Sequence, residues 1–309
     1  MHQVSILIPA YNEKEAITES VNHALAALKS SGVSGEVLVI DDGSSDGTAE
    51  MAAEAGARVI SHSVNAGYGA ALKTGIRNTE SKLIAITDAD GTYPIDRLPD
   101  LLKKMQETGA VMVTGSRTGD HVNIEPVRVP FKKMVRSLAS YIVQQPVPDL
   151  NSGLRLFTRD LAVRYIHLYP DGFSFTSTIT VASLCDNLKV EYVPINYYRR
   201  QGRSKITPDL FFSFIFLVLR LSVLFRPFRV FFPVSVICFI LGFVKLVFDL
   251  ATAAAVSLNT GAPFFELPIV SPTAVMFILA SLQIILMGMV AEALAAQNRR
   301  VPFSIRKES

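Results

Sequence analysis

Two long apolar segments near the carboxyl end most constrain what this 309-residue chain can fold into. As helices, residues 230–256 and 272–296 are each long enough to cross the roughly 30 Å hydrocarbon core of a membrane. Between them, residues 257–271 carry no Lys or Arg. Basic residues lie outside the pair instead, namely Arg226, Arg229, Arg299, Arg300, Arg306 and Lys307. Because positive charge gathers on the cytoplasmic side, both termini and the large amino-terminal part are expected in the cytoplasm.

Composition also divides the rest of the chain. Residues 210–225 are apolar apart from Arg220, and Pro227 follows, which predicts an interfacial or re-entry helix rather than a full span. Within the first span, the four-residue spacing of Lys245 and Asp249 predicts an intrahelical ion pair, and the alternative is a contact with the second span, where Gln283 is expected at similar depth. A packing or oligomer role is favoured over a role in chemistry. The expected parts are a large domain, an interfacial helix, two spans and a basic tail, at residues 1–208, 209–229, 230–298 and 299–309.

Apolar runs alternate with segments of helical periodicity through the amino-terminal part. Strands are expected at residues 4–8, 36–40, 58–61, 83–86, 110–114 and 190–198, and helices at residues 13–28, 70–77, 98–106, 159–167 and 177–187. This alternation predicts an α/β fold with a doubly wound sheet and right-handed crossovers. The net charge of +3 is too small to indicate binding to nucleic acid.

Two further features bear on compartment and membrane contact. The two cysteines, Cys185 and Cys238, are far apart and make no disulfide framework or metal-ligand spacing, as expected in a reducing compartment. Residues 130–143 predict an amphipathic helix whose basic face carries Lys132, Lys133 and Arg136. Such a helix suits a membrane interface, and the alternative is a surface helix packed on the domain.

Two acids follow the predicted strand at residues 83–86. Asp88 and Asp90 are separated by one residue, so in extended backbone both side chains point to the same side. Ligands of open α/β sheets bind outside the carboxyl ends of the strands, where these acids are expected. Paired carboxylates there suit Mg²⁺ or Mn²⁺ shared with a substrate diphosphate, whereas the alternative is a solvated acidic turn.

Ordered motifs give the chain a specific resemblance. Four of them resemble the family 2 inverting glycosyltransferases of the GT-A (Rossmann-like) fold: VSILIPAYNE at residues 4–13, DDGSSDGT at 41–48, NAGYGA at 65–70 and DAD at 88–90. Three more features narrow the resemblance to polyprenyl-phosphate glycosyltransferases, the group that includes dolichol-phosphate mannose synthase. These are DLNSGLR at residues 149–155, the basic run at 199–205 and the two spans. The motifs cover residues 4–208, and the membrane part resembles the family in architecture alone.

The resemblance implies that a nucleotide sugar binds at the ends of the first strands. Pro9, Tyr11 and Glu13 would line the nucleotide pocket. Asp41 would read the base or the ribose, and Asp88 would lie near the donor.

The resemblance also implies a metal between the acids and the diphosphate. Asp90, with Asp88 beside it, would hold Mg²⁺ or Mn²⁺ bridging the diphosphate. Many dolichol-phosphate mannose synthases carry a Gln two residues after the second Asp as a further ligand. This chain has Thr92 there, so a hydroxyl or a water is expected as the third ligand.

On the acceptor side, the resemblance implies a second set of charged residues. Asp149 would face the acceptor, and three cations, Arg117, Arg203 and Lys205, would bind phosphates. The alternative for the basic run at residues 199–205 is a cluster attracted to anionic lipid, and both roles are compatible.

The expected function is transfer of a sugar from GDP-mannose or a UDP-sugar to a polyprenyl or dolichyl phosphate, at the cytoplasmic face of the cell membrane. A lipid phosphate is already an anionic nucleophile, so it needs positioning more than a general base. The spans could also pair copies of the chain as a homo-oligomer. The alternatives are a transferase with another membrane lipid acceptor and a non-catalytic membrane scaffold with a degenerate transferase domain. Absence of Trp argues against processive polysaccharide synthases, which carry a Gln-x-x-Arg-Trp motif.

Overall fold

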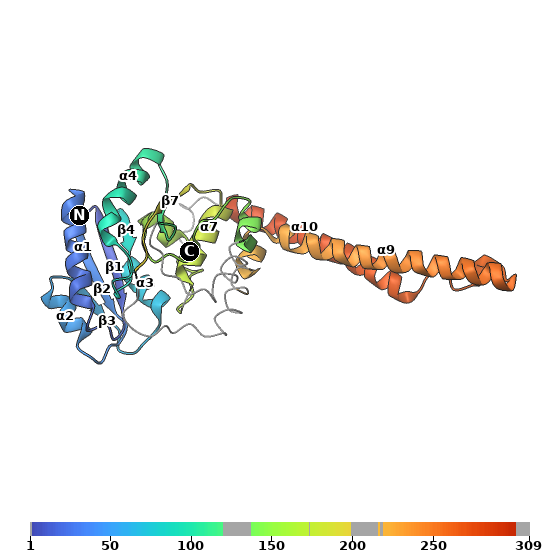
Figure 1. Ribbon diagram of the computed structural model, residues 1–309, viewed down its shortest axis with the longest axis horizontal. Coiled ribbons are helices and arrows are strands. Elements are labelled where there is room, and N and C mark those ends of the chain that lie inside the picture. Colours follow the sequence, from blue (N-terminus) through green and yellow to red (C-terminus); the bar gives the residue numbers. More distant parts are fainter. Residues whose placement is uncertain (1, 120–136, 173, 199–215, 217–218, 301–309) are drawn as a thin grey trace. The chain divides into compact units, whose positions relative to one another are not determined.

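The computed structural model describes the chain except for residues 1, 120–136, 173, 199–215, 217–218 and 301–309. The chain divides into two compact units, Met1–Val218 and Leu219–Ser309. The first unit is a sheet with helices on both of its faces, and the second is built from two long helices (Figure 1).

Seven strands form the sheet of the first unit. They are β1 (Val4–Ala10), β2 (Gly35–Asp41), β3 (Arg58–Ser61), β4 (Leu83–Ile86), β5 (Met112–Ser116), β6 (Arg155–Thr158) and β7 (Val190–Pro194). Their order in the sheet is β3-β2-β1-β4-β6-β5-β7. β6 is antiparallel to both of its neighbours, and the other pairings are parallel. The carboxyl ends of β1, β2, β4 and β5 therefore meet at the edge where β6 begins.

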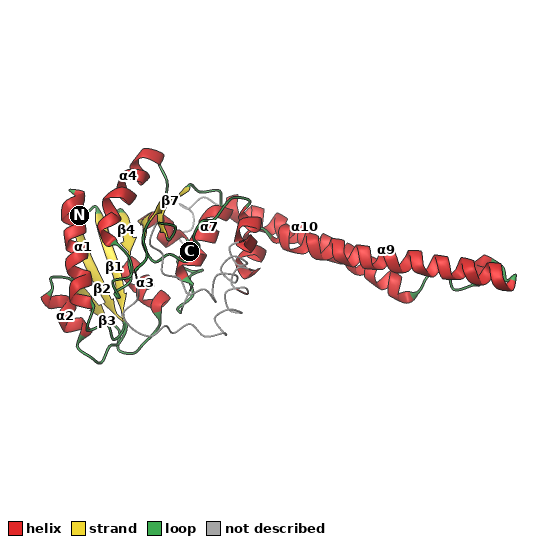
Figure 2. Cartoon of the chain, viewed as in Figure 1, coloured by secondary structure: helices red, strands yellow, loops and turns green. Residues whose placement is uncertain are grey.

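Helices cover the sheet in two groups, which Figure 2 shows in red around the yellow strands. α1 packs against α2 and α4, while α3 packs against α6. A short 3-10 turn, η1, precedes α4, and residues 137–143 are also helical. The bounds are α1 (Ile17–Ser31), α2 (Thr48–Glu54), α3 (Tyr68–Arg77), η1 (Ile95–Arg97), α4 (Leu98–Thr108), α6 (Arg159–Arg164) and α7 (Phe175–Cys185).

Alternate residues of β1 pack on opposite faces of the sheet, as the two-residue period of a strand requires. Ile6 and Ile8 belong to a buried cluster that includes Leu101 of α4. Leu7 faces α3 instead, and a β-carbon added to Gly75 of that helix would lie 2.9 Å from Leu7 Cδ1. β1 is buried along its whole length, so it is the central strand that positions the site.

The predicted α/β fold is confirmed, with one strand that the sequence does not reveal. β6 has the sequence RLFT, which opens on a buried Arg and leads directly into α6, so no bounded apolar run marks it. Because β6 is antiparallel, the sheet is mixed rather than wholly parallel. The last strand ends at Pro194 rather than Tyr198, and α1 begins at Ile17 rather than at residue 13.

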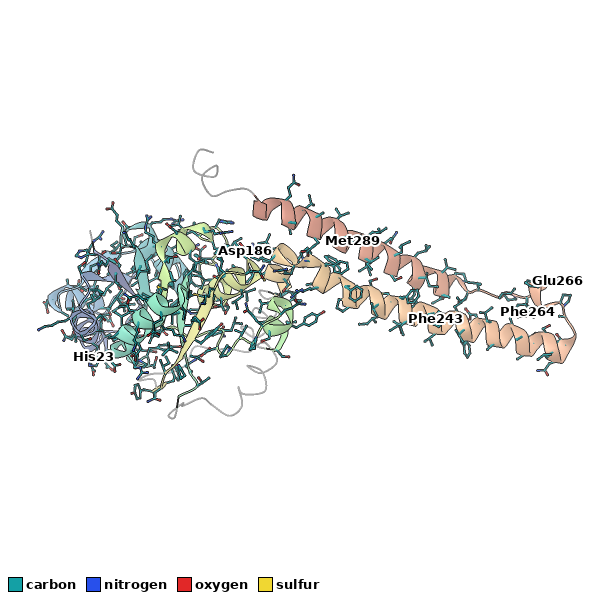
Figure 3. The ribbon with its side chains drawn as sticks, turned by 90° about the horizontal axis from the view of Figure 1, so that it is seen from above. His23, Asp186, Phe243, Phe264, Glu266 and Met289 are labelled. Carbon is teal, nitrogen blue, oxygen red and sulfur yellow. The ribbon has the colours of Figure 1, made fainter. Side chains whose placement is uncertain are left out.

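The second unit is a hairpin of α9 (Pro227–Thr260) and α10 (Pro272–Arg300). Both helices are long and apolar enough to cross a membrane, and only 11% and 17% of their most apolar windows are buried within the structure. Their apolar side chains are therefore exposed for contact with lipid or with another protein. Figure 3 shows the helices side by side, with Phe264 and Glu266 in their connection and Phe243 and Met289 on their sides.

Polar side chains inside the hairpin connect its parts. Lys245 and Asp249 form the ion pair that their spacing predicts, within α9. Asp249 Oδ2 also accepts a hydrogen bond of 3.1 Å from the Ser271 amide, just before α10 begins. The Ser235 hydroxyl of α9 donates to the Ser281 carbonyl of α10 at 2.9 Å. These contacts support a packing role for the charges in α9.

Two predicted helices fall largely outside the described residues. The structure describes only residues 137–143 of the segment 130–143, so Lys132, Lys133 and Arg136 lie outside it. Of residues 210–225 it describes residue 216 and the helical residues 219–225.

Candidate functional site

The sequence-predicted site residues gather at one edge of the sheet. The loops that leave the sheet there carry Tyr11 and Glu13 after β1, Asp41 at the end of β2, Asp88 and Asp90 after β4, and Arg117 after β5. Residues 149–154 enter β6 from the same edge because β6 is antiparallel to β4 and β5. Pro9 lies further back, buried inside β1 and paired with Ile40.

The loops after β1 and β2 are joined by hydrogen bonds. The Asn12 amide donates to Ser44 Oγ at 2.9 Å, and the Ser45 amide donates to Asn12 Oδ1 at 3.0 Å. The Glu13 amide donates to Thr48 Oγ1 at 3.0 Å. Asn12 has a left-handed backbone with φ of 53°, a conformation that Asn adopts more readily than most residues. Tyr11 and Glu13 are thus carried on a loop that is fixed to its neighbour.

Asp42, for which the motifs predict no role, holds the next loop. Its carboxylate lies 2.7 Å from His62 Nδ1 and accepts hydrogen bonds from the Ala66 and Gly67 amides at 2.9 and 2.8 Å. Asp41 is equally buried, at 3% exposed. In the sequence, Asp42 is marked only by its place beside Asp41 in DDGSSDGT. That position does not reveal that Asp42 binds the loop containing Ala66 and Gly67.

Close packing at the start of α3 requires the second glycine of the NAGYGA motif, Gly69. A β-carbon added to Gly69 would lie 2.0 Å from the carbonyl oxygen of Pro170. The amides of Gly69 and Ala70 donate to the carbonyls of Gly172 and Asp171, at 3.1 and 2.8 Å. Because protein carbonyls already occupy these amides, they are not available for binding a phosphate.

Asp88 is held by the residue that begins α3. Tyr68 Oη donates to Asp88 Oδ1 at 3.0 Å. Burial, followed by the negative charge of Asp88, raises the pKa of Tyr68 well above its ordinary value. The phenol therefore keeps its proton at neutral pH and orients the Asp88 carboxylate.

Asp90 is held by Thr92, whose hydroxyl is one of the two alternatives expected for a third metal ligand, the other being a water. Its Oδ1 accepts hydrogen bonds from the Thr92 hydroxyl at 2.7 Å and from the Thr92 amide at 3.2 Å. Thr92 is only 1% exposed, so its hydroxyl serves to orient Asp90. Among the described residues, no group of three or more His, Cys, Asp or Glu side chains could hold a metal ion.

The donor set of Asp88 and Asp90 fits a divalent ion that is shared with a substrate. Both are carboxylates at the ligand edge, and a phenol, a hydroxyl and an amide hold one oxygen of each. Mg²⁺ is commonly bound in proteins through one or two carboxylates together with substrate phosphates and water. Two protein ligands are therefore sufficient for such a site.

Asp149 and Arg117 form a buried bidentate ion pair. Arg117 Nε and Nη2 donate to Asp149 Oδ2 and Oδ1 at 2.7 and 2.8 Å, and the Arg117 amide donates to Oδ2 at 3.1 Å. Burial alone would raise the pKa of Asp149, but the hydrogen bonds and the charge of Arg117 lower it below its ordinary value. The guanidinium also lies 5.3 Å from the centre of the Tyr197 ring. The predicted contact of Arg117 with a phosphate stays a prediction.

The loop that carries Asp149 closes against Asp88. A β-carbon added to Gly153 would lie 2.9 Å from Asp88 Oδ2 and 2.8 Å from Tyr93 Cε2. Distances below 3.0 Å leave no room for a side chain unless a neighbour moves. Gly153 therefore brings the predicted acceptor-side loop into contact with the predicted donor-side carboxylate.

The basic run begins beside this site. The Tyr198 amide donates to the Thr92 carbonyl at 3.1 Å, and Tyr198 is the last described residue before the run. Arg203 and Lys205 themselves lie outside the described residues. Their predicted binding of phosphates stays a prediction, although the chain leads into them from the edge that carries Asp90.

The mixed sheet and the acids at its ligand edge define a glycosyltransferase domain of the GT-A type. The chain belongs to glycosyl transferase family 2, whose family model matches residues 5–165. A second model, the GtrB C-terminal hairpin, matches residues 226–296, which form most of the α9–α10 hairpin. The family predicted from the motifs is thereby confirmed.

Curated archaeal proteins are similar to this chain over about two thirds of its length. It is 30% identical over 207 residues to the low-salt glycan biosynthesis hexosyltransferase Agl6 of Haloferax volcanii, and 31% identical over 209 residues to the glycosyltransferase AglJ of that organism. These matches cover 66% and 67% of this chain, but 49% of Agl6 and 66% of AglJ. The chain thus spans about half the length of Agl6. The uncharacterized protein MJ1222 of Methanocaldococcus jannaschii is 30% identical, with 66% of this chain and 87% of MJ1222 covered.

Among solved structures, glucosyl-3-phosphoglycerate synthase of Mycobacterium tuberculosis is similar in fold. Its complex with phosphoglyceric acid has a TM-score of 0.57 and 20% identity, and the match covers 72% of this chain and 80% of that one. Its complex with Mn²⁺, uridine diphosphate and glucosyl-3-phosphoglycerate has a TM-score of 0.56 with the same identity and coverage. At this identity the likeness concerns the fold alone.

Proposed function

We propose that this chain transfers a sugar from a nucleotide sugar to a polyprenyl phosphate, with inversion at the transferred carbon. The observation that carries the proposal is the contact between Gly153 and Asp88, because it joins a donor-side carboxylate and an acceptor-side loop in one site. Support also comes from the family, from the hexosyltransferase name of Agl6 and from the GtrB C-terminal hairpin.

The donor is a nucleotide sugar, either GDP-mannose or a UDP-sugar. It binds across the loops after β1, β2 and β4, with Tyr11, Glu13 and Asp41 around the nucleoside. The hydrogen bonds between the first two of these loops support a pocket that is formed before the donor arrives. The Mycobacterium tuberculosis synthase of similar fold has been crystallised with UDP-glucose and Mn²⁺.

Asp88 and Asp90 would hold Mg²⁺ or Mn²⁺ at the donor diphosphate. When bound, the ion supplies positive charge that stabilises the leaving diphosphate. The chain's own part is to keep both carboxylates in place, through Tyr68 for Asp88 and through Thr92 for Asp90. Such pre-oriented charges contribute most where charge develops during the reaction.

The acceptor phosphate approaches from the side of the Asp149 loop. A phosphate monoester is an anionic nucleophile, so the site must position it and offset its charge rather than remove a proton. Asp149 has a lowered pKa and is paired with Arg117, so it stays ionised and acts to orient Arg117. Arg117, Arg203 and Lys205 would bind the phosphates of the two substrates.

The α9–α10 hairpin anchors the chain in the membrane that holds the lipid acceptor. The basic residues outside the spans favour a cytoplasmic position for the first unit and for both termini. The apolar flanks of the hairpin are also able to contact a second copy of the chain. Another membrane lipid as acceptor, or a scaffold without catalysis, are the alternatives.

Incubation of membranes that contain the protein with labelled nucleotide sugars, one at a time, tests the proposed function. We expect label from one donor to enter the organic phase as a lipid-linked sugar, and to depend on Mg²⁺ or Mn²⁺. Labelled lipid that forms equally in membranes carrying the Asp90→Asn variant, with excess chelator, would contradict the proposal. Binding of a nucleotide sugar without turnover of any acceptor would favour the scaffold.

A further inference from the structure

We propose that Arg155 is a positioning residue, which fixes the loop at residues 149–154 against Asp88 and so sets where the acceptor meets the donor. The role of this loop in acceptor binding rests on the function proposed above. The positioning itself is a property of the fold and is tested separately below.

Arg155 is the largest fully buried side chain of the chain's described part, with 0% of its surface exposed. Its Nε donates to the Ser152 carbonyl at 2.7 Å, and its Nη2 donates to the Leu150 carbonyl at 2.8 Å. Its Nη1 donates to the hydroxyl of Thr180 on α7. Among the described residues, these partners are neutral oxygens rather than a carboxylate, so the guanidinium is not part of a buried ion pair.

The two carbonyls that Arg155 binds belong to the loop itself. Leu150 and Ser152 lie between Asp149, which is held by Arg117, and Gly153, which touches Asp88. Arg155 therefore fixes the middle of the loop while the ion pair fixes its start. A shift of this backbone would change how closely Gly153 approaches Asp88, where even an added β-carbon would lie only 2.9 Å from Asp88 Oδ2.

The surroundings of Arg155 are poorly suited to a purely stabilising role. On the sheet it pairs with Thr114 of β5, which in turn pairs with Tyr192 of β7. The hydroxyls of Thr114, Tyr192 and Ser152 are buried, and none has a hydrogen-bond partner among the described residues. Burial, opposed by the charge of Arg155, raises the pKa of Tyr192 to about 12, so this phenol stays neutral. A buried guanidinium whose partners are neutral oxygens is costly to remove from water, so stability alone does not explain an Arg at this position.

The shape of the guanidinium explains why this position carries Arg. A planar fork presents Nε and Nη2 to two carbonyls of one loop while Nη1 turns to Thr180 on α7. An ammonium at the end of a lysine side chain is a point donor and does not reproduce this divergent set. Arg155→Lys therefore keeps a buried cation but loses the paired hydrogen bonds to the Leu150 and Ser152 carbonyls.

A matched control lies at the other end of the same strand. Arg159 follows β6 directly, and its Nε donates to the Thr79 carbonyl at 2.8 Å. It is thus another arginine that binds a backbone carbonyl, but its partner lies away from the ligand edge. Arg159→Lys removes a guanidinium that binds a backbone carbonyl, without touching the loop at residues 149–154.

Hydrogen exchange measured by mass spectrometry on the full-length, detergent-solubilised protein tests the positioning directly. In Arg155→Lys we expect amides of the peptide covering residues 149–154 to exchange at least about tenfold faster, as loss of charge-assisted hydrogen bonds predicts. Exchange of β4 should not change, and Arg159→Lys should leave residues 149–154 protected. Unchanged protection of this loop in Arg155→Lys, or equal loosening of the whole sheet, would overturn the proposal.

Kinetics with the same three proteins connect the loop to transfer. We expect Arg155→Lys to lower kcat at least about tenfold while the Kd of the nucleoside diphosphate changes less than about twofold, because the donor side is intact. Arg159→Lys should leave both values near those of the unmodified chain. Equal losses of kcat in the two variants, or loss of nucleotide binding in Arg155→Lys, would contradict the positioning role. Absence of sugar transfer to polyprenyl phosphate by the unmodified chain would instead contradict the proposed function, while leaving the exchange result valid.

Discussion

Asp90 and Asp149 are buried to the same extent, with 8% of each residue exposed, but their surroundings differ. Asp90 is oriented by the hydroxyl and the amide of Thr92, both neutral donors. Asp149 is neutralised by a bidentate guanidinium. Thr92 brings no counter-charge to Asp90, whereas Arg117 brings a positive charge to Asp149. We therefore propose that the same residue type serves metal binding on one side of the site and orientation of a cation on the other.

This difference assigns distinct tasks to the two halves of the site. Under the proposed function, Asp88 and Asp90 on the donor side bind a divalent ion at the diphosphate. On the acceptor side, Asp149 and Arg155 hold a loop and a guanidinium in place. Mutations on the donor side are therefore expected to act on chemistry, and those on the acceptor side on stability and geometry.

The largest effect is expected for Asp90→Asn. Loss of the carboxylate removes charge at the leaving diphosphate, which should lower turnover on the order of 10³-fold or more while the fold stays intact. Initial rates with saturating donor, together with the midpoint of thermal unfolding, measure both parts. Asp100→Asn removes an exposed carboxylate of α4 that pairs with Arg97 and is the matched control, with full activity expected. If Asp90→Asn and Asp100→Asn had equal rates, Asp90 would have no special part in turnover. The proposed difference between Asp90 and Asp149 would then be wrong.

Asp149→Asn is expected to act on stability. It leaves Arg117 buried without its counter-charge, which should cost about 3 kcal/mol. The sign of the pH dependence follows from the lowered pKa of Asp149 in the folded chain. Its contribution is fully present above the unfolded pKa of about 3.9 and is lost as the pH falls toward the folded pKa. Unfolding midpoints from pH 7 down to pH 3 should therefore converge for the two proteins, and a difference that grows in acid would be inconsistent with this pair.

Gly153→Ala probes the contact between the two halves. The added methyl group must displace Asp88 or Tyr93, so we expect about a tenfold loss of kcat and a stability cost of about 1–2 kcal/mol. Gly172→Ala is the control, because a β-carbon at Gly172 meets nothing within 4 Å. Steady-state kinetics on both variants measure the difference. A fully active Gly153→Ala protein would mean that Asp88 and the loop do not need to meet so closely.

The sequence predicts the elements of the site better than it predicts their contacts. Apolar runs in the sequence locate β1, β2 and β4. The acids after β4 are then predicted as site residues, because ligands of such sheets bind at the carboxyl ends of the strands. The ion pair of Arg117 and Asp149 is not visible, because the two residues are 32 apart in sequence and meet only through the antiparallel insertion of β6.

Close packing is the other kind of contact that sequence patterns leave open. Nothing local distinguishes Gly153, whose β-carbon would strike Asp88, from Gly172, whose β-carbon would meet nothing. Arg155 is missed for a related reason, since arginine is almost never fully buried and nothing in its neighbouring sequence marks this one as buried. Both facts depend on the three-dimensional path of the loop.

The smallest effect is expected in the hairpin. Lys245→Met removes the ion pair with Asp249, but Asp249 keeps its hydrogen bond from the Ser271 amide. We therefore expect rates of transfer within about twofold of the unmodified chain, and at most a small loss of stability, since such a pair contributes little on its own. Assays in matched proteoliposomes measure the rates. A loss of activity beyond tenfold would give the hairpin a part in chemistry and not only in anchoring.

The most direct measurement of the central claim compares polyprenyl phosphate with the uncharged prenol of the same length as acceptors. Both lipids are supplied to the purified full-length chain with labelled donor and Mg²⁺ or Mn²⁺, and lipid-linked label is counted. A site that binds a phosphate nucleophile with cations predicts rapid labelling of the phosphate, and labelling of the prenol that is slower on the order of 10²-fold or more. Equal labelling of the two lipids would contradict it.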